Sequence, residues 1–538
     1  FYLADKRGVY MYLKRNYYIK IILLFFTISV LAGTFIYFEK EEAMVVMGVK
    51  VIDKDFYEQL IKDKVQMTVD ENLQMQGIKL PYNESEGVYY ISQSLESDEW
   101  NGKIEVNEEN QFYWLKDKMF DDKKKAIQNG HVFSYIVVSD DTYTEGKVVF
   151  TGLPVICLDG PDDGENRLSQ FSIFWINEDT KRYETFQSIS MYHQRGAGSV
   201  LFNKGNYKIS LLDESGNSIK YGVLGMQKDD DWKLNSLYTD SSNVRDQLSY
   251  YLGDKMNELE DEPVLSSSMK YCEVFINNEY MGLYGVMVPI NRKSMNLKEG
   301  DYLYKVRSWG IPSVDDFEYF SEDDDVWVDH IMTLTCKYPF EIGKGEQWKP
   351  LMDYYQLFYW DEEKDVSNME QLVDIDNIID YYWFCQITYA NDNRWKNAYY
   401  IMKEQKNGKF KFYKTVWDLN YTWGDNFSDN PQTLWTDFQY HDDLFRDIVD
   451  YETLMQMDKD YMVERTQEKW KTWRDTFLNT DSLTSTAKEI MQPLIDSGAW
   501  DRNARRWPES ENSKDITEMS NWIDYRLNVL DQYIDSLE

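Results

Sequence analysis

The hydrophobic pattern changes near residue 374, and this change constrains the fold more than any other feature of the sequence. Upstream of it, apolar and polar residues alternate as in half-buried strands, for example over 87–92 and 131–138. Downstream, apolar residues recur at helical spacing over 375–389, 442–457, 461–478, 482–497 and 516–537. One helix candidate, 243–259, lies in the first part, and one strand candidate, 409–417, lies in the second. A strand-rich part followed by a helix-rich part predicts an α+β protein with two lobes.

An apolar run near the N-terminus predicts a membrane anchor over residues 19–38. Its length is close to the ~20 residues that a helix needs to cross a bilayer. Lys14 and Arg15 precede the run and Glu39 follows it, so the positive-inside rule places the N-terminus in the cytoplasm and the rest of the chain outside. A cleaved signal peptide is the alternative, because Val30-Leu31-Ala32 resembles a cleavage site. The apolar run continues beyond that site, which favours an uncleaved anchor.

These patterns divide the chain into five segments. They are a cytoplasmic N-terminus (1–18), the anchor (19–38), a β-rich extracytoplasmic module (44–148), a strand-rich N-terminal lobe (149–290) and a helical C-terminal lobe (291–538). We expect the β-rich module to lift the two lobes off the membrane. The chain opens with Phe1, and we interpret Met11 as the natural start, with residues 1–10 as an upstream extension.

Charge and composition exclude several classes of function. The formal net charge is −36, so the protein repels nucleic-acid phosphates and anionic lipid surfaces and attracts basic proteins or divalent cations. The four cysteines have no CxxC spacing, which excludes a zinc ribbon. The four histidines form no HExxH motif, which argues against a histidine-based zinc hydrolase.

An aspartate and an asparagine follow the apolar helix predicted to end at residue 389. Asp392 and Asn397 have the spacing of a protein-kinase catalytic loop, in which the Asp accepts the proton of the attacking hydroxyl and the Asn holds a magnesium ion. The spacing alone is common, and the structural alternative is a capping Asp and a turn Asn. The residues that come next strengthen the catalytic interpretation, because two strands joined by a turn lead to Trp417-Asp418. An Asp at the end of such a hairpin is suited to holding magnesium.

A turn rich in small residues lies in the strand-rich lobe. Gln194-Arg195-Gly196-Ala197-Gly198-Ser199 would let backbone amides approach a phosphate, although a glycine-containing hairpin is a common alternative. Lys204 and Lys208 follow, the second on the predicted strand 206–212.

Several short motifs occur in an order that resembles the CotH (spore coat protein H) kinase family over residues 150–537. They are, in chain order, Phe150-Thr151-Gly152-Leu153-Pro154-Val155, Arg195-Gly196-x-x-Ser199, Lys204 and Tyr207, Trp232-x-Leu234 with Asp240 and Arg245, Ile276-Asn277-Asn278-x-Tyr280-x-Gly282-x-Tyr284, Leu303-Tyr304-Lys305, Asp392 with Asn397, and Trp417-Asp418. Each motif is modest, and their joint order carries the resemblance.

The resemblance implies an atypical protein-kinase-like bilobal fold. It also implies transfer of phosphate from ATP, with Mg²⁺, to Ser or Thr of a basic secreted, surface or spore-coat protein of a bacterium. Carried over by position, Asp392 would be the catalytic base, and Asn397, Asp418 and Asn420 the metal ligands. The loop residues Arg195, Gly196, Gly198 and Ser199 would lie over the phosphates, and Lys204, Lys208 or Lys233 would pair with them.

Three departures from the family's pattern leave alternatives open. The loop reads Arg-Gly-Ala-Gly-Ser where the family usually has Arg-Gly-Asn-Ser-Ser, Val288 stands where a Glu is common, and Asn420 stands where a second Asp is frequent. The first alternative is therefore a non-catalytic, pseudokinase-like surface or adhesion module of the same fold. The second is transfer of a nucleotidyl group. The presence of Asp392, Asn397 and Asp418 favours catalysis over adhesion, and nothing in the sequence separates phosphoryl from nucleotidyl transfer.

Overall fold

The computed structural model of the 538-residue chain describes residues 44–537 apart from 69–72, 162–166, 197–198, 263, 308, 319–329, 332, 340–345, 362–368, 426–437 and 511. Its mixture of helices and strands confirms the predicted α+β class. The predicted cytoplasmic N-terminus and membrane anchor lie outside the described residues. Within the described ranges, no helix has the length and apolar character that crossing a membrane requires.

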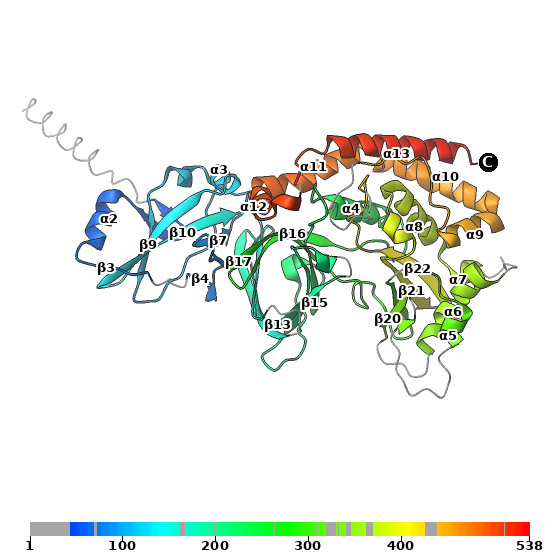
Figure 1. Ribbon diagram of the computed structural model, residues 1–538, viewed down its shortest axis with the longest axis horizontal. Helices are drawn as coiled ribbons and strands as arrows, with labels where there is room; N and C mark the ends of the chain where they lie inside the picture. The colour runs from blue at the N-terminus through cyan, green and yellow to red at the C-terminus, as the bar shows by residue number, and fades with distance from the viewer. Residues whose placement is uncertain are drawn as a thin grey trace, which may run out of the picture.

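The β-rich module is built around one sheet (Figure 1). The sheet order is β1 (Val45–Val46), β2 (Val49–Ile52), β8 (Gln111–Leu115), β9 (Val132–Val138), β10 (Thr142–Thr151), β7 (Val88–Ser92) and β6 (Tyr82–Asn83), with β3 (Val65–Gln66) beside β10. Other elements of the module are α2 (Lys54–Ile61), α3 (Lys123–Gln128), β4 (Gln74–Met75) and β5 (Ile78–Lys79). Its apolar core continues into the next part of the chain through Val155, Phe174 and Phe275. The boundary predicted between residues 148 and 149 therefore falls inside β10 and inside a shared core.

A closed β-barrel forms most of the segment predicted as the N-terminal lobe. The order around it is β11 (Val155–Asp159), β12 (Arg167–Asn177), β13 (Arg182–Arg195), β14 (Asn206–Leu212), β15 (Asp231–Asn235), β17 (Glu279–Met287) and β16 (Met269–Ile276). Parallel pairing of β11 with β16 closes the barrel, and α4 (Arg245–Asn257) connects β15 to β16. Because side chains alternate along a strand, Trp232 and Leu234 fill the barrel core while Lys233 points outward.

The segment predicted as the helical lobe also contains a sheet. Its order is β19 (His330–Ile331), β20 (Leu334–Tyr338), β18 (Tyr302–Val306), β21 (Ala398–Glu404) and β22 (Phe410–Val416). The helices of this part are α5 (Val314–Glu318), α6 (Lys349–Tyr355), α7 (Met369–Leu372), α8 (Ile375–Thr388), α9 (Val449–Met457), α10 (Lys459–Thr476), α11 (Thr480–Asp496), α12 (Ala499–Arg506) and α13 (Thr517–Asp535). Helix α8 packs against β22, and its side chains join those of α4 in the largest apolar core.

Two C-terminal helices reach back to the N-terminal half of the molecule (Figure 1). Helix α11 contacts both α4 and α3, and α12 packs on β17 of the barrel. The Asn503 side-chain oxygen accepts hydrogen bonds from the Lys204 ammonium at 2.8 Å and from the Leu283 amide at 3.1 Å. The Arg502 guanidinium makes two hydrogen bonds of 2.8 Å to the carboxylate of Glu273, also in the barrel. The end of the chain thus completes the polar contacts of the barrel.

Most predicted helices and strands have their expected places, and one helix is shorter. Helix α9 begins at Val449, whereas the pattern predicts a start at residue 442. The residues before α9 are not helical because tertiary hydrogen bonds take their carbonyl groups. The Arg526 guanidinium donates to the carbonyl oxygens of His441 and Asp443, and the Gln386 amide donates to that of Phe445.

Candidate active site

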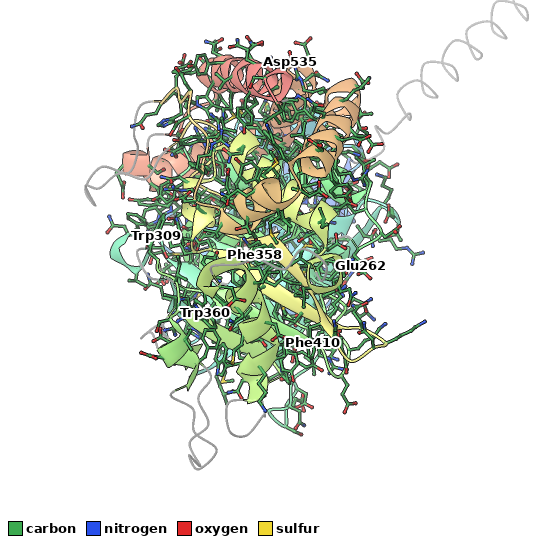
Figure 2. All side chains as sticks on the ribbon, turned by 90° about the vertical axis from the view of Figure 1, so that its right-hand side faces the viewer. Glu262, Trp309, Phe358, Trp360, Phe410 and Asp535 are labelled. Atoms are coloured by element: carbon green, nitrogen blue, oxygen red, sulfur yellow. The ribbon has the colours of Figure 1, made fainter. Side chains whose placement is uncertain are left out.

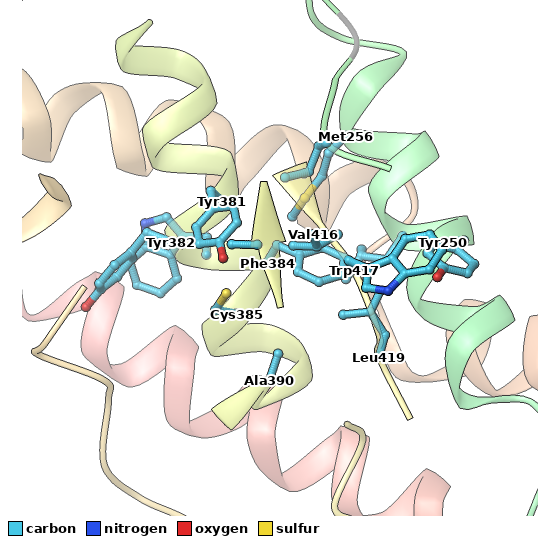
Figure 3. Close-up of a cluster of buried hydrophobic side chains, with 14 of the residues drawn as sticks. Tyr250, Met256, Tyr381, Tyr382, Phe384, Cys385, Ala390, Val416, Trp417 and Leu419 are labelled. Carbon is cyan, nitrogen blue, oxygen red and sulfur yellow. The ribbon is translucent and has the colours of Figure 1, made fainter. Parts of the chain in front are cut away.

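Helix α8 fixes the start of the loop that carries Asp392. The Asp374 side chain caps the helix by accepting the Asn377 amide at 3.1 Å, and nearly every later residue of α8 is buried. The helix ends at Thr388, and the left-handed backbone of the next residue, Tyr389 (φ 51°), turns the chain into a 3₁₀ helix over Asn391–Arg394. Figure 3 shows apolar side chains of α8, of the end of β22 and of α4 packed together beneath this turn. The rigid core therefore sets the position of the loop.

Asp392 is 8% exposed and has two partners on one oxygen. The Asn397 amide donates to Asp392 Oδ2 at 2.9 Å, and the Lys396 ammonium lies 2.9 Å from the same atom. Burial raises the pKa of the Asp392 carboxyl above its ordinary value, Lys396 opposes that rise, and the charge of Asp418 adds to it. The effect of Asp418 on this pKa indicates that the two predicted carboxylates share one electrostatic environment.

Asn393, which the sequence analysis does not single out, ties the two halves of the site together. Its side-chain amide donates to the carbonyl oxygens of Asn397 and Trp417, both at 2.9 Å. The Tyr381 hydroxyl of α8 donates to the Asn393 carbonyl at 2.6 Å. These contacts hold the loop after α8 against the end of β22, directly before Asp418.

Two of the predicted metal ligands have a strained backbone. Asn397 has φ 52° and Asp418 has φ 64°, in the left-handed region that non-glycine residues seldom adopt. Asn and Asp tolerate this region best among such residues, and strain of this kind is concentrated at functional sites. The backbone at both positions is consistent with side chains held in a required direction.

A group of cations faces Asp418 from the barrel and from β18. Arg195, Lys233, Trp417 and Asp418 are among the residues that line a narrow cavity. The Lys233 ammonium lies 3.8 Å from the centre of the Trp417 ring. Burial, and then the positive charge of Arg195, lower the pKa of Lys233 and reduce that of Lys305 to about 8. Cations brought this close together favour a polyanionic ligand, which would relieve their mutual repulsion.

Asp246, at the start of α4, holds the backbone that follows Asp418. Its carboxylate accepts the Leu419 amide at 2.9 Å and the Asn235 side-chain amide at 2.9 Å. Burial, reinforced by the charge of Asp418, raises the pKa of Asp246 to about 7. Asp246 therefore links α4, β15 and the Asp418 turn.

The other residues that the sequence predicts for phosphate binding do not all lie beside Asp418. Gly196 has φ 121°, and a Cβ there would lie 1.8 Å from Ser199 Oγ, so the loop requires glycine at this position. The Lys204 ammonium is buried against the Leu283 carbonyl and Asn503, away from the cations that face Asp418. Lys208 pairs with Asp231 at 3.0 Å.

Asn420 lies close to the site but is hydrogen-bonded elsewhere. Its side-chain amide donates to the Thr239 hydroxyl at 2.8 Å. Gly198 is outside the described residues. Of the three lysines that the sequence proposes for the phosphates, Lys233 is the one that shares a cavity with Asp418.

The residues present fit a magnesium–nucleotide complex. Magnesium in such sites takes one or two carboxylates and completes its coordination with water and substrate phosphates. Asp418 can supply such a carboxylate, and Asn397, whose nitrogen donates to Asp392, keeps its amide oxygen for a metal. Within the described ranges, no three His, Cys, Asp or Glu side chains are grouped as a metal cage, so a metal here would need phosphate or water ligands.

Sequence reasoning misses Lys305, Lys396, Asp246 and Asn393 as members of the site. Lys305 is the one that a sequence signal could have identified, because it belongs to the motif Leu303-Tyr304-Lys305. The strand that carries it, β18, pairs with β21 next to the catalytic loop. The roles of Asp246 and Asn393 depend on tertiary hydrogen bonds, which no local pattern encodes.

A comparison with protein families gives a match over most of the chain. Residues 192–530 match the family model described as CotH kinase protein. A comparison with curated proteins finds no match. The matched segment contains the glycine turn that follows Arg195, α4, Asp392 and Asp418.

Proposed function

This chain belongs to the CotH kinase protein family, and from that premise we propose that it is an atypical protein kinase that transfers phosphate from ATP to Ser or Thr of a surface or coat protein. The observation that carries the proposal is the arrangement of Asp392, with Lys396 and Asn397 on one oxygen, near Asp418 and the cations Arg195, Lys233 and Lys305. A buried base close to a group of cations suits the transfer of a phosphoryl group.

Asp392 acts as the general base. Lys396 and Asn397 both contact Oδ2, which leaves Oδ1 for the substrate hydroxyl. The hydroxyl oxygen forms a bond to the γ-phosphorus, its proton passes to Asp392 Oδ1, the bond from that phosphorus to the bridging oxygen breaks, and ADP leaves. The raised pKa of Asp392 makes the carboxylate a stronger proton acceptor.

The cations orient and neutralise the phosphates. Lys233 lies on β15 of the barrel and Lys305 on β18, and Arg195 lies at the end of β13 beside the glycine turn. Magnesium bound through Asp418 and Asn397 would neutralise the charge that develops on the phosphates. The lowered pKa values of the two lysines rise again when phosphate charge is present, which favours their charged forms.

The proposed location is the outer side of a cell membrane, on one N-terminal anchor helix. The motivation is the apolar run at 19–38 with basic residues before it and acidic residues after it. The proposed substrate is a basic protein rich in Ser or Thr, because a protein of net charge −36 attracts basic partners.

Phosphate transfer by the 538-residue chain tests the proposal. The purified protein is incubated with γ-labelled ATP, Mg²⁺ and a basic Ser-rich protein, and the label is followed by autoradiography. We expect label on the added protein or on the chain itself. Nucleotide binding without any transfer would instead support the non-catalytic surface module, and transfer of label from α-labelled ATP would support nucleotidyl transfer.

A further inference from the structure

The start of helix α4 holds the turn that follows Asp418. The Arg245 side chain is 2% exposed, and its Nε donates a hydrogen bond to the Thr422 carbonyl at 3.0 Å. Arg245 is itself fixed, because its backbone amide and its guanidinium both donate to the Asp240 carboxylate, at 2.8 and 2.6 Å. Ser249, one helical turn later, is fully buried, and its hydroxyl oxygen lies 3.3 Å from that of Thr422. Two buried polar side chains on one face of α4 thus reach the same residue.

These contacts continue as a directed chain of hydrogen bonds to Leu419, which directly follows the proposed metal ligand. An indole nitrogen can only donate, so Trp423 Nε1 donates to Ser249 Oγ at 2.8 Å. The Thr422 hydroxyl donates to the Leu419 carbonyl at 2.6 Å, which leaves its oxygen to accept from Ser249. The Leu419 amide donates to Asp246 of α4. Side chains of α4 therefore hold both backbone polar groups of Leu419, one directly and one through Thr422.

The backbone of this turn needs such support. Asp418 has φ 64° and Trp423 has φ 53°, and a bulky residue such as tryptophan is seldom found in this left-handed region. A strained backbone persists only where the surrounding contacts over-determine it. The Trp423 amide also donates to the carbonyl of Thr388, the last residue of α8, at 2.8 Å. The turn is therefore held between α4 and the helix that leads to the Asp392 loop.

The two ends of α4 differ in exposure. The side chains of Arg245, Asp246 and Ser249 are buried at its start. Beyond its last turn the chain reaches the surface, where Figure 2 labels Glu262. The Glu262 side chain is 49% exposed and pairs with Lys403 of β21. The buried start of the helix, rather than its exposed end, makes the contacts with the turn.

We propose that α4 is a positioning element for Asp418, and that Ser249 is a positioning residue whose hydroxyl fixes the direction of the Asp418 carboxylate through Thr422 and Leu419. The inference rests on the proposed function, because it takes Asp418 as a magnesium ligand. Magnesium demands near-ideal octahedral geometry, whereas calcium accepts flexible coordination. A small displacement of the carboxylate should therefore weaken magnesium binding more than calcium binding.

Calorimetric titration of ATP into the 538-residue chain, with either Mg²⁺ or Ca²⁺ present, tests this inference. We expect Ser249→Ala to lower the ATP affinity about fivefold with Mg²⁺, as the loss of one buried hydrogen bond allows, and less than about twofold with Ca²⁺. Ser497→Ala is the matched control, because it removes another fully buried serine hydroxyl, which donates to the Leu494 carbonyl at the end of α11. Ser497→Ala and Glu262→Gln should leave both affinities unchanged.

A double-variant cycle tests the route of the effect. Trp423→Phe removes the indole donor but keeps an aromatic ring, and it should weaken Mg²⁺-supported binding in the same way as Ser249→Ala. Because both changes break the same hydrogen bond, the double variant should be within about twofold of the weaker single variant. Trp423→Phe also probes the same link from its other side, so the inference remains testable if Ser249→Ala does not fold.

Unchanged Mg²⁺-supported affinity in folded Ser249→Ala or Trp423→Phe, an equal loss with both ions, or fully additive losses in the double variant would overturn the inference. These outcomes differ from failure of the proposed function. A parent protein that binds ATP equally with Mg²⁺ and with EDTA would remove the metal role of Asp418 itself. A parent and variants with the expected affinities, but without any phosphate transfer, would remove the proposed catalysis and leave the positioning role in place.

Discussion

Asp392 and Asp418 have different partners, so their loss should have different effects. Asp392 is oriented by Lys396 and Asn397 and offers one free oxygen to a hydroxyl. We expect Asp392→Asn to keep nucleotide affinity, measured by calorimetry, and to lower phosphate transfer about 10²–10⁴-fold, the usual contribution of a general base. If the residue were only a cap, the variant would lose about 0.5–2 kcal/mol of stability and transfer phosphate normally per folded molecule.

Asp418→Asn should weaken magnesium-dependent nucleotide binding as well as turnover. The change removes a carboxylate ligand but keeps a residue that tolerates the φ of 64°, so the turn after β22 should persist. Calorimetric titration of ATP with Mg²⁺ measures the effect, and a thermal melt checks the fold. An unchanged affinity in the presence of Mg²⁺ would mean that Asp418 does not hold the metal.

For single residues, the sequence indicates candidate site residues better than it indicates which side chains each of them contacts. Asp392, Asn397 and Asp418 can be proposed as candidates because their spacing and the strands between them together match a kinase-like order. Lys204 and Lys233 cannot be ranked in the same way, because strand periodicity does not say which neighbouring segment each lysine faces. The structure buries Lys204 against Asn503, about three hundred residues later, and turns Lys233 towards Trp417.

Helix α12 is the element that joins the C-terminal part to the barrel most directly. Arg502 and Glu273 are both buried, and the Tyr280 hydroxyl adds a hydrogen bond of 2.5 Å to the same carboxylate. We expect Glu273→Gln to lower the free energy of unfolding by about 3–5 kcal/mol, because it leaves the Arg502 charge buried without its counter-charge. Chemical denaturation measures the loss.

The double variant Glu273→Leu/Arg502→Met is the matched control for that prediction. It removes both charges and should recover much of the lost stability, since a buried ion pair adds little over apolar residues of similar volume. A single variant as stable as the parent would mean that the pair is more hydrated than its burial indicates.

At the scale of elements, prediction succeeds where local pattern dominates and fails where tertiary contacts do. Helix α8 and strands β14 and β22 lie close to their predicted ranges because their apolar periodicity is long and uninterrupted. Helix α12 is short and rich in charged residues, so its sequence resembles a loop. Its helical conformation depends on the barrel contacts of Arg502 and Asn503.

For the whole molecule, the strong negative charge predicts that nucleotide binding depends on magnesium. The net charge of −36 and the two carboxylates of the site repel a triphosphate, and Arg195, Lys233 and Lys305 oppose that repulsion. We expect ATP affinity to fall at least tenfold when EDTA replaces Mg²⁺ in a calorimetric titration. Equal affinity in both buffers would indicate a metal-free ligand site.

The proposed orientation in the membrane concerns the whole chain as well. Protease added to intact spheroplasts should digest the body of the protein, residues 44–538, while a cytoplasmic marker protein survives. Protection of the body together with the marker would contradict the proposed location.

The order of the segments along the chain can be derived from sequence patterns, whereas the shared core between the β-rich module and the barrel cannot, because it depends on which apolar faces meet.

The contact between Lys204 and Asn503 has a consequence for biosynthesis. These residues are 299 positions apart, so at about 5–20 residues per second a ribosome needs about 15–60 s to supply the partner of the barrel lysine. During that interval, burying Lys204 in the nascent barrel would leave its ammonium without the hydrogen bond to Asn503. Glu273 likewise lacks its partner Arg502. The barrel therefore cannot reach its final state co-translationally on its own, and a nascent chain truncated before α12 should remain sensitive to chaperones and proteases even though all of its strands are present.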